Sequence, residues 1–234
     1  MIVKEIVSQF ASNTLGNGCV IFRCNFDVAQ YSDTQFFYYN VPFHNSLINA
    51  VPKRRAEFLA GRYCAQQALL KLGIHNTFVG VGKNRNPIWP TDIVGSISHD
   101  KDNAIAIVKP ETSQNSIIGV DIERWIGKDE LQDMRKMIIN EEEYWLLMKA
   151  GLDTTQAITL GFSAKESFFK AAYKIVNEYF GFEEAQITAI HRSAHGGFLK
   201  LNISDSLKTK LPSRTEFKVS FFFESERVLT ICNH

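Results

Sequence analysis

The residues best suited to chemistry lie in the stretch from Ile117 to Trp125, which reads Ile-Ile-Gly-Val-Asp-Ile-Glu-Arg-Trp. Its alternation predicts a β-strand, and because successive strand side chains point to opposite faces, Asp121 and Glu123 share one face. Val120 and Ile122 point the other way, toward the expected core. Neighbouring carboxylates repel each other unless a cation neutralises them, and Mg²⁺ prefers oxygen ligands. The pair therefore predicts a magnesium site, with a solvated acidic edge strand as the alternative.

A second candidate stretch runs from Phe162 to Lys170 and is interpreted as the start of a helix. Glu166 and Lys170 are four residues apart, so they share a helix face. The apolar stripe expected to hold this helix on a core consists of Phe169, Ala172, Tyr173 and Val176. Glu166 is either a further metal ligand or the partner of Ser163 in a capping box that begins the helix.

Together, the Gly-x-Asp-x-Glu strand and the Lys-Glu-Ser-x-x-Lys helix resemble the signature of the 4′-phosphopantetheinyl transferases of the Sfp class. Upstream, the segments Arg54–Arg62, Trp89–Pro90 and Gly95–His99 resemble the subgroup of the enterobactin synthase component D. The resemblance covers residues 51–176. Many members carry Trp where this chain has Phe162, a change that keeps the packing but loses an indole N–H donor.

This resemblance implies an α+β fold of two similar halves about a pseudo-twofold axis, with the active site between them. We expect an N-terminal half at residues 1–110 and a C-terminal half at residues 111–234. The implied reaction moves the 4′-phosphopantetheine arm of coenzyme A to a serine of an apo acyl or peptidyl carrier protein and releases adenosine 3′,5′-bisphosphate. Such carriers serve siderophore, nonribosomal peptide, polyketide or fatty-acid synthesis.

In that reaction the carboxylates of Asp121, Glu123 and Glu166 would hold Mg²⁺ against the diphosphate, and Lys170 would meet another phosphate oxygen. The catalytic set implied by the resemblance is thus Asp121, Glu166 and Lys170. The serine hydroxyl needs a base, for which Glu166 and a metal-bound water are both candidates. The role of Lys165 is left open.

A basic helix is predicted to begin at Pro52 and to end at Gly73. Its first turn carries three cations, Lys53, Arg54 and Arg55. The helix dipole disfavours each cation there by about 0.3–1 kcal/mol, and Arg62 lies further along nearly the same face. A bound anion would relieve this arrangement. The alternative is a solvated basic helix with Glu57 as a partial partner.

Further binding residues are expected around a loop at Val79–Pro90, from which Lys83 and Arg85 project. Two strands follow at residues 93–99 and 104–108, which places His99 at a strand end. The resemblance implies that Ser98 and His99 line the coenzyme A diphosphate. The full set expected to bind coenzyme A is Arg54, Arg62, Lys83, Ser98, His99 and Lys170.

The remaining patterns predict scaffold. Within residues 1–40, strands are expected at 18–26 and 35–39, and later strands at 186–190, 197–203, 216–224 and 228–232. A helix is predicted over residues 130–150, ended by Gly151. In the family this region helps to receive the carrier protein, and its exposed apolar residues would suit a helix-in-groove contact.

Composition narrows the function classes. A chain of 234 residues with 45% hydrophobic residues and a net charge of +1 is typical of a globular protein and argues against a broad nucleic-acid-binding surface. Its four cysteines lack Cys-x-x-Cys spacing, which argues against zinc and disulfides and favours free thiols in a reducing compartment. Without a leader or membrane-span pattern, we expect a cytoplasmic monomer with neither nucleic acid nor membrane as a partner.

Two other functions use the same residues. The first is a magnesium-dependent phosphohydrolase built on the same carboxylates, which would act with no carrier protein present. The second is a non-catalytic subunit that binds coenzyme A or another nucleotide without turnover.

Overall fold

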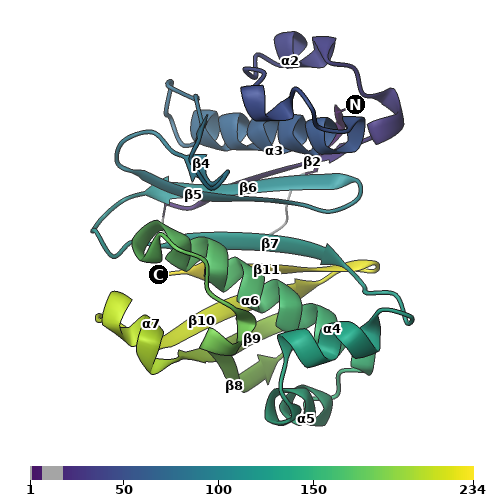
Figure 1. The fold of residues 1–234 in the computed structure, drawn as a ribbon, viewed down its shortest axis with the longest axis vertical. Coiled ribbons are helices and arrows are strands. Elements are labelled where there is room, and N and C mark those ends of the chain that lie inside the picture. Colours follow the sequence, from purple (N-terminus) through teal and green to yellow (C-terminus); the bar gives the residue numbers. More distant parts are fainter. Residues whose placement is uncertain (1, 7–17) are drawn as a thin grey trace. The chain divides into compact units, whose positions relative to one another are not determined.

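The computed structural model describes residues 2–6 and 18–234, and the chain divides into two compact units, Met1–Gln114 and Asn115–His234. Each unit is an antiparallel sheet with one long helix lying against it (Figure 1). The predicted α+β class is confirmed. Residues 1 and 7–17 of the β-prone segment 1–40 lie outside the described residues.

The N-terminal unit has a sheet in the order β1-β2-β6-β5. Its strands are β1 (Ile2–Ile6), β2 (Val20–Phe26), β5 (Ile93–His99) and β6 (Asn103–Pro110). The strands predicted at 18–26, 93–99 and 104–108 are therefore confirmed. Where a loop was expected at 79–90, the structure has a small hairpin of β3 (Gly80–Val81) and β4 (Pro87–Ile88).

The basic helix is α3 (Pro52–Lys71), and Pro52 occupies its first turn as predicted. Gly73 follows with a φ of +86°, a left-handed conformation that favours glycine at a helix end. Gly61 lets the helix approach the sheet, because a Cβ there would lie 2.8 Å from Cγ2 of Ile97. The helix thus presents its polar residues from a fixed position over β5 and β6.

One predicted strand of this unit is wrong. Residues 35–38 belong to the short helix α2 (Thr34–Tyr38), and Tyr39 is its C-cap. The side chain of Gln35 accepts the backbone N–H of Ser32 at 3.1 Å, which supports the first turn. Only Phe36 of this helix is buried, so its aromatic residues do not alternate between two buried faces as a strand would require. Two 3₁₀ turns, Val28–Gln30 and Asn45–Leu47, flank it.

The C-terminal unit has a five-stranded sheet in the order β7-β11-β10-β9-β8. Its strands are β7 (Ile118–Arg124), β8 (Ala185–Arg192), β9 (Gly196–Ile203), β10 (Glu216–Phe223) and β11 (Arg227–Asn233). The predicted strands of this half are confirmed. The long helix α6 (Thr154–Val176) lies against the sheet, with the short helix α7 (Asp205–Lys210) and the 3₁₀ turn Phe182–Glu184 nearby (Figure 1).

The single helix predicted at 130–150 is wrong, because two helices, α4 (Leu131–Ile138) and α5 (Glu141–Lys149), occupy that range. Ile139 between them has extended backbone, with φ −128° and ψ 141°. Asn140 then begins α5 with a capping box, in which its side chain accepts the N–H of Glu143 at 2.9 Å. The acidic run therefore starts a new helix, where carboxylates match the helix dipole.

The predicted start of α6 is also wrong. The helix begins after Asp153, whose side chain accepts the N–H of Gln156 at 2.8 Å in a capping box. Ser163 lies inside the helix, where its hydroxyl contacts that of Thr230. Glu166 consequently has no capping role. Of the expected apolar stripe, Ala172 and Val176 are buried and the two aromatic side chains are half-buried.

Within residues 2–6 and 18–234, no helix combines the length and the apolar character that crossing a membrane requires. The four cysteines are free thiols, as predicted.

Candidate functional site

The acidic strand β7 and helix α6 are in very close contact within the C-terminal unit. A Cβ at Gly119 would lie only 1.9 Å from the carbonyl oxygen of Ser167 and 2.7 Å from the backbone nitrogen of Ala171. Only glycine permits this approach. It brings the face of α6 that carries Glu166 and Lys170 down onto the strand that carries Asp121.

Asp121 is the central residue of this contact. Val120 and Ile122 are fully buried, as the alternation predicts, but Asp121 is also only 1% exposed. Nζ of Lys170 donates to Oδ1 of Asp121 at 2.6 Å. A solvated acidic face is therefore the wrong description of Asp121, although β7 does form one edge of its sheet.

Glu123 and Glu166 belong to the same electrostatic group. Burial lowers the pKa of Lys170, but Asp121, then Glu166 and Glu123 raise it, and the net shift is upward. For Glu166, burial raises the pKa, Lys170 lowers it and Asp121 raises it again, with a net upward shift. The three carboxylates of Asp121, Glu123 and Glu166 thus all act electrostatically on the Lys170 ammonium, and Asp121 also acts on Glu166.

The donor set has the chemistry that Mg²⁺ requires, because it offers carboxylate oxygens from a strand and from a packed helix. In the part of the chain that the structure describes, however, no three His, Cys, Asp or Glu side chains gather closely enough to hold a metal ion. One oxygen of Asp121 is engaged by Lys170 instead. The carboxylates are thus of the type that Mg²⁺ prefers, and in this structure Asp121 is paired with the ammonium of Lys170.

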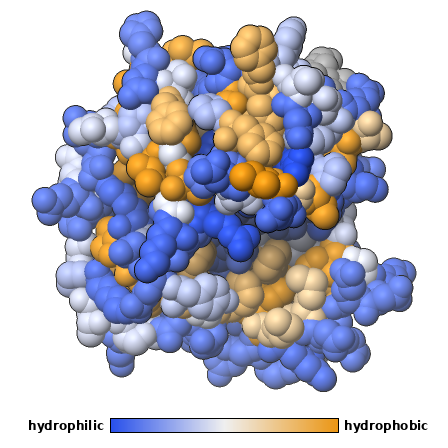
Figure 2. All heavy atoms as spheres, turned by 45° about the horizontal axis from the view of Figure 1, so that its top comes forward, coloured by the Kyte–Doolittle hydropathy of each residue, from blue (hydrophilic) through white to orange (hydrophobic). Residues whose placement is uncertain are grey.

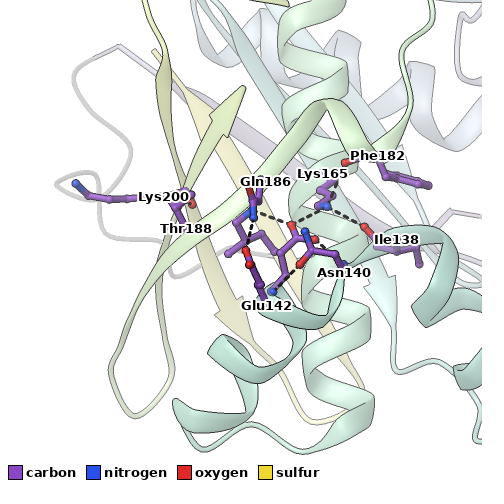
Figure 3. A network of polar contacts seen from close by, with 10 residues as sticks. Ile138, Asn140, Glu142, Lys165, Phe182, Gln186, Thr188 and Lys200 are labelled. Carbon is purple, nitrogen blue, oxygen red and sulfur yellow. Dashed lines mark hydrogen bonds and ion pairs between the residues drawn. The ribbon is translucent and has the colours of Figure 1, made fainter. Parts of the chain in front are cut away.

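Lys165, the neighbour of Glu166, has a well-defined structural environment (Figure 3). Its Nζ donates to the carbonyl oxygens of Ile138 at 2.8 Å and Phe182 at 3.1 Å. It also pairs with Oε1 of Glu143 at 2.7 Å, and the two side chains are 3% and 2% exposed. Lys165 therefore joins α6 to the end of α4 and the start of α5.

Glu143 extends this network to the sheet. Its Oε1 accepts the backbone N–H of Ile187 in β8 at 2.8 Å, and its Oε2 accepts the N–H of Asn140 at 2.8 Å. The two charges suit the helix dipoles. The ammonium of Lys165 lies at the C-terminus of α4, and the carboxylate of Glu143 lies at the N-terminus of α5. The network therefore connects α4, α5 and β8 to the part of α6 that carries Glu166.

The N-terminal unit contains a cavity of about 450 Å³ that is lined in part by residues of α3. Its polar lining includes Arg54, Arg62, Arg85, His99 and Glu57. Nη1 of Arg54 lies 3.3 Å from Nε2 of His99, so the helix and the end of β5 contribute to one basic cluster. The cavity brings together three of the residues predicted to bind coenzyme A.

Arg62 is the most buried cation of this cavity, with 7% of the residue exposed. Its guanidinium lies over the ring of Phe58 at 4.9 Å, and Nη2 donates to the carbonyl of Gly80 at 2.9 Å. Burial, followed by repulsion from Arg54, lowers its pKa to about 10, so it is still charged at pH 7. The Nε atom is buried and has no hydrogen-bond partner among the described residues.

Other predicted residues lie elsewhere. Lys83 is exposed and Ser98 is buried, and neither belongs to the cavity lining, whereas Arg85 of the same loop does. Arg55, one of the three cations of the first turn that a bound anion was expected to relieve, is engaged by groups of the protein. It donates to the carbonyls of Leu47 at 2.9 Å and Ile48 at 2.6 Å and pairs with Asp33 at 2.7 Å.

The cavity also includes residues that the sequence did not single out. Ser46, Asn49 and Ala50 reach it from the turn before α3. Their signal in the sequence is weak, since they lie in an ordinary polar connection. Arg85 carried a better signal, a basic residue in a loop rich in glycine and asparagine, and its φ of +63° shows that the loop holds it in an unusual conformation.

The surface of the protein mixes hydrophobic and hydrophilic residues, and on the face in Figure 2 hydrophobic groups stand among hydrophilic ones. In the region predicted to receive a carrier protein, Met137 of α4 and Trp145 of α5 are exposed. These two side chains are available for contact with a partner.

Comparison with known proteins gives a consistent result. The family model described as the 4′-phosphopantetheinyl transferase N-terminal domain matches residues 43–109, and that of the 4′-phosphopantetheinyl transferase superfamily matches residues 117–232. The chain is 31% identical over 207 residues to enterobactin synthase component D of Salmonella typhi, covering 88% of this chain and 82% of that protein. With the Escherichia coli (strain K12) protein of the same name, identity is 32% over 220 residues, covering 93% and 94%. The 4′-phosphopantetheinyl transferase Npt of Nocardia iowensis is 34% identical over 142 residues, covering 61% and 62%.

Proposed function

The chain belongs to the 4′-phosphopantetheinyl transferase superfamily, and from this premise we propose how its own residues carry out the transfer. It is a transferase of the enterobactin synthase component D type, which moves the 4′-phosphopantetheine group from coenzyme A to a serine of an apo carrier protein. The phosphohydrolase and the non-catalytic subunit find no support among the relatives, two of which are named as 4′-phosphopantetheinyl transferases. The monomeric state, the cytoplasmic location and the absence of nucleic-acid partners stay predictions.

The observation that carries our assignment of roles is the bond between Lys170 and Asp121, which lies inside the segment matched by the superfamily model. Phosphoryl-type transfer depends mainly on positioning and on neutralising charge. Lys170 is the cation of this group, and Asp121 fixes its ammonium at a defined point. We assign Lys170 the neutralisation of an oxygen of the coenzyme A diphosphate.

Asp121, Glu123 and Glu166 are the residues that would hold Mg²⁺. When bound, the ion would supply further neutralisation of the diphosphate charge. Glu166 and a metal-bound water are the two candidates to accept the proton of the carrier serine. Gly119 acts indirectly, since it permits the close approach of the strand and the helix.

In the N-terminal unit, Arg54 and Arg62 are proposed to hold the 3′-phosphate of coenzyme A, and His99 contributes to the same basic cluster. The support is the cavity itself, which gathers the guanidinium groups of Arg54 and Arg62 with His99 on one wall. Lys83 and Ser98 keep their predicted roles as ligand contacts, although they do not line this cavity. Met137 and Trp145 are proposed to contact the carrier protein.

The decisive experiment incubates the protein with coenzyme A, Mg²⁺ and a panel of apo carrier proteins, followed by intact-mass measurement of each carrier. We expect the carrier to gain one phosphopantetheine group and adenosine 3′,5′-bisphosphate to appear in equal amount. The matched control is a carrier whose acceptor serine is replaced by alanine. Release of products without carrier modification would favour a phosphohydrolase, and tight coenzyme A binding without either product would favour a binding subunit.

A further inference from the structure

Glu57 is an unusual residue for a cavity that receives an anion. It is only 9% exposed, and it lines the cavity together with the cations Arg54, Arg62 and Arg85 and the imidazole of His99. Glu57 is the acidic residue of that lining, and a carboxylate repels a phosphate placed beside it. The presence of this charge therefore calls for a ligand group other than phosphate.

The carboxylate of Glu57 is near two cations, Arg54 and Lys53, and near the imidazole of His99, without being hydrogen-bonded to any of them. Its Oε2 lies 3.8 Å from Nη1 of Arg54 and 3.9 Å from Nε2 of His99, and its Oε1 lies 3.9 Å from Nζ of Lys53. These separations exceed hydrogen-bond length, for which N–H···O distances of about 2.7–3.2 Å are usual. Among residues 2–6 and 18–234, no hydrogen bond to this carboxylate is formed.

Buried polar groups are normally hydrogen-bonded, so an acceptor left open at a cavity wall indicates a ligand donor. The same cavity is lined by guanidinium donors, those of Arg54, Arg62 and Arg85. A matching ligand must bring an acceptor to these cations and a donor to the carboxylate of Glu57. A phosphate supplies the first, and a hydroxyl or an amino group near that phosphate supplies the second.

The adenosine end of coenzyme A has this combination, because its 3′-phosphate adjoins the ribose 2′-hydroxyl, and the base carries an exocyclic amino group. We propose that Glu57 accepts a hydrogen bond from the adenosine moiety of coenzyme A, through the 2′-hydroxyl or the 6-amino group, and so determines specificity for this nucleotide. This inference rests on the proposed function. Apolar walls from Leu47, Phe58 and Ile97 line the same cavity and can contact the base or sugar.

The test measures binding of three ligands by calorimetry: adenosine 3′,5′-bisphosphate, its 2′-deoxy analogue and its inosine analogue, which lacks the amino group. Wild-type protein should bind the adenosine compound about tenfold to a hundredfold more tightly than one of the analogues, as expected for a hydrogen bond to a charged acceptor. Which analogue loses affinity identifies the donor.

Glu57→Ala should bind the adenosine compound and that analogue with equal affinity, and Glu57→Gln should retain part of the discrimination. The control variant is Arg62→Ala, which should weaken all three ligands and preserve their ratio, because it removes the phosphate contact. Melting temperatures of the variants show that each is folded.

Equal binding of all three ligands by the wild type would overturn the inference, as would an equal loss of all three in Glu57→Ala. The second pattern would mean that Glu57 orients Arg54 and His99 and does not touch the nucleoside. Failure of the proposed function is distinguishable, since the wild type would then bind none of these ligands and leave apo carriers unmodified.

Discussion

Replacing Lys165 with methionine tests the buried network that adjoins Glu166. Methionine has similar length but no charge, so the substitution removes three contacts, those with Glu143, the carbonyl of Ile138 and the carbonyl of Phe182. Both charged side chains of the pair are almost fully buried. The carboxylate of Glu143 would remain in the interior without its counter-charge.

Removing one partner of a buried ion pair typically costs about 3–5 kcal/mol. Glu143 would keep the N–H groups of Asn140 and Ile187, which limits the loss from the stranded charge. The carbonyls of Ile138 and Phe182 would lose their donor, which adds about 1–3 kcal/mol to the loss of stability for each buried group left unsatisfied. The retained contacts of Glu143 and the orphaned carbonyls act in opposite directions, so we expect Lys165→Met to destabilise the protein by at least about 3–5 kcal/mol, a large part of the 5–15 kcal/mol of a typical domain.

The assay is urea unfolding at neutral pH, followed by circular dichroism and by tryptophan fluorescence. Lys200→Met is the matched control, because Nζ of Lys200 lies 2.9 Å from Oε1 of Glu216 but the two side chains are 39% and 49% exposed. Its cost should stay within about 1 kcal/mol. Lys165→Met/Glu143→Gln should recover part of the stability, because no charge remains buried.

Equal effects of Lys165→Met and Lys200→Met would refute this reasoning, since the network would then contribute no more than a surface pair. A second readout localises the effect. Hydrogen exchange at the amide of Ile187, which donates to Glu143, should accelerate in Glu143→Gln more than at amides in the N-terminal unit.

Four other outcomes are expected. Asp121→Asn should lower the transfer rate by about a hundredfold or more while the protein stays folded, and unchanged turnover would remove Asp121 from the site. Gly119→Ala should cost about 1–3 kcal/mol and reduce turnover, because its Cβ would meet the carbonyl of Ser167. Glu166→Gln should melt above the wild type at neutral pH in chelator, since the raised pKa of Glu166 means that ionisation opposes folding, and the difference should shrink as the pH falls through that pKa. A pH-independent difference would contradict this. Arg62→Ala should weaken coenzyme A about tenfold to a hundredfold but dephospho-coenzyme A much less, and equal losses would withdraw the 3′-phosphate assignment.

The sequence identified local features well where one pattern had one physical cause. Pro52 and Gly73 mark the two ends of α3, as their backbone preferences require. Val120 and Ile122 are buried, as strand alternation predicts. Asp121 shows the limit of such a pattern. Alternation gives the face to which a side chain points, but whether that face is covered depends on packing from elsewhere in the chain.

The errors arose where two local signals competed. Ser163 and Glu166 have capping-box spacing, yet Asp153 and Gln156 have it too, and only the second pair begins a helix. A serine inside a helix is tolerated when its hydroxyl finds a partner, as Ser163 does with Thr230. Spacing alone could not choose between the two, because the deciding contact is with a residue distant in sequence.

Lys165 gives the clearest case of what sequence reasoning could not supply. Its motif placed it beside Glu166, but its partners Glu143, Ile138 and Phe182 come from three other elements. The break between α4 and α5, which the helical spacing of residues 130–150 concealed, exposes a carbonyl end and an amide end that need opposite charges. Lys165 and Glu143 satisfy those ends, so the lysine of the motif and the helix break are two parts of one electrostatic arrangement.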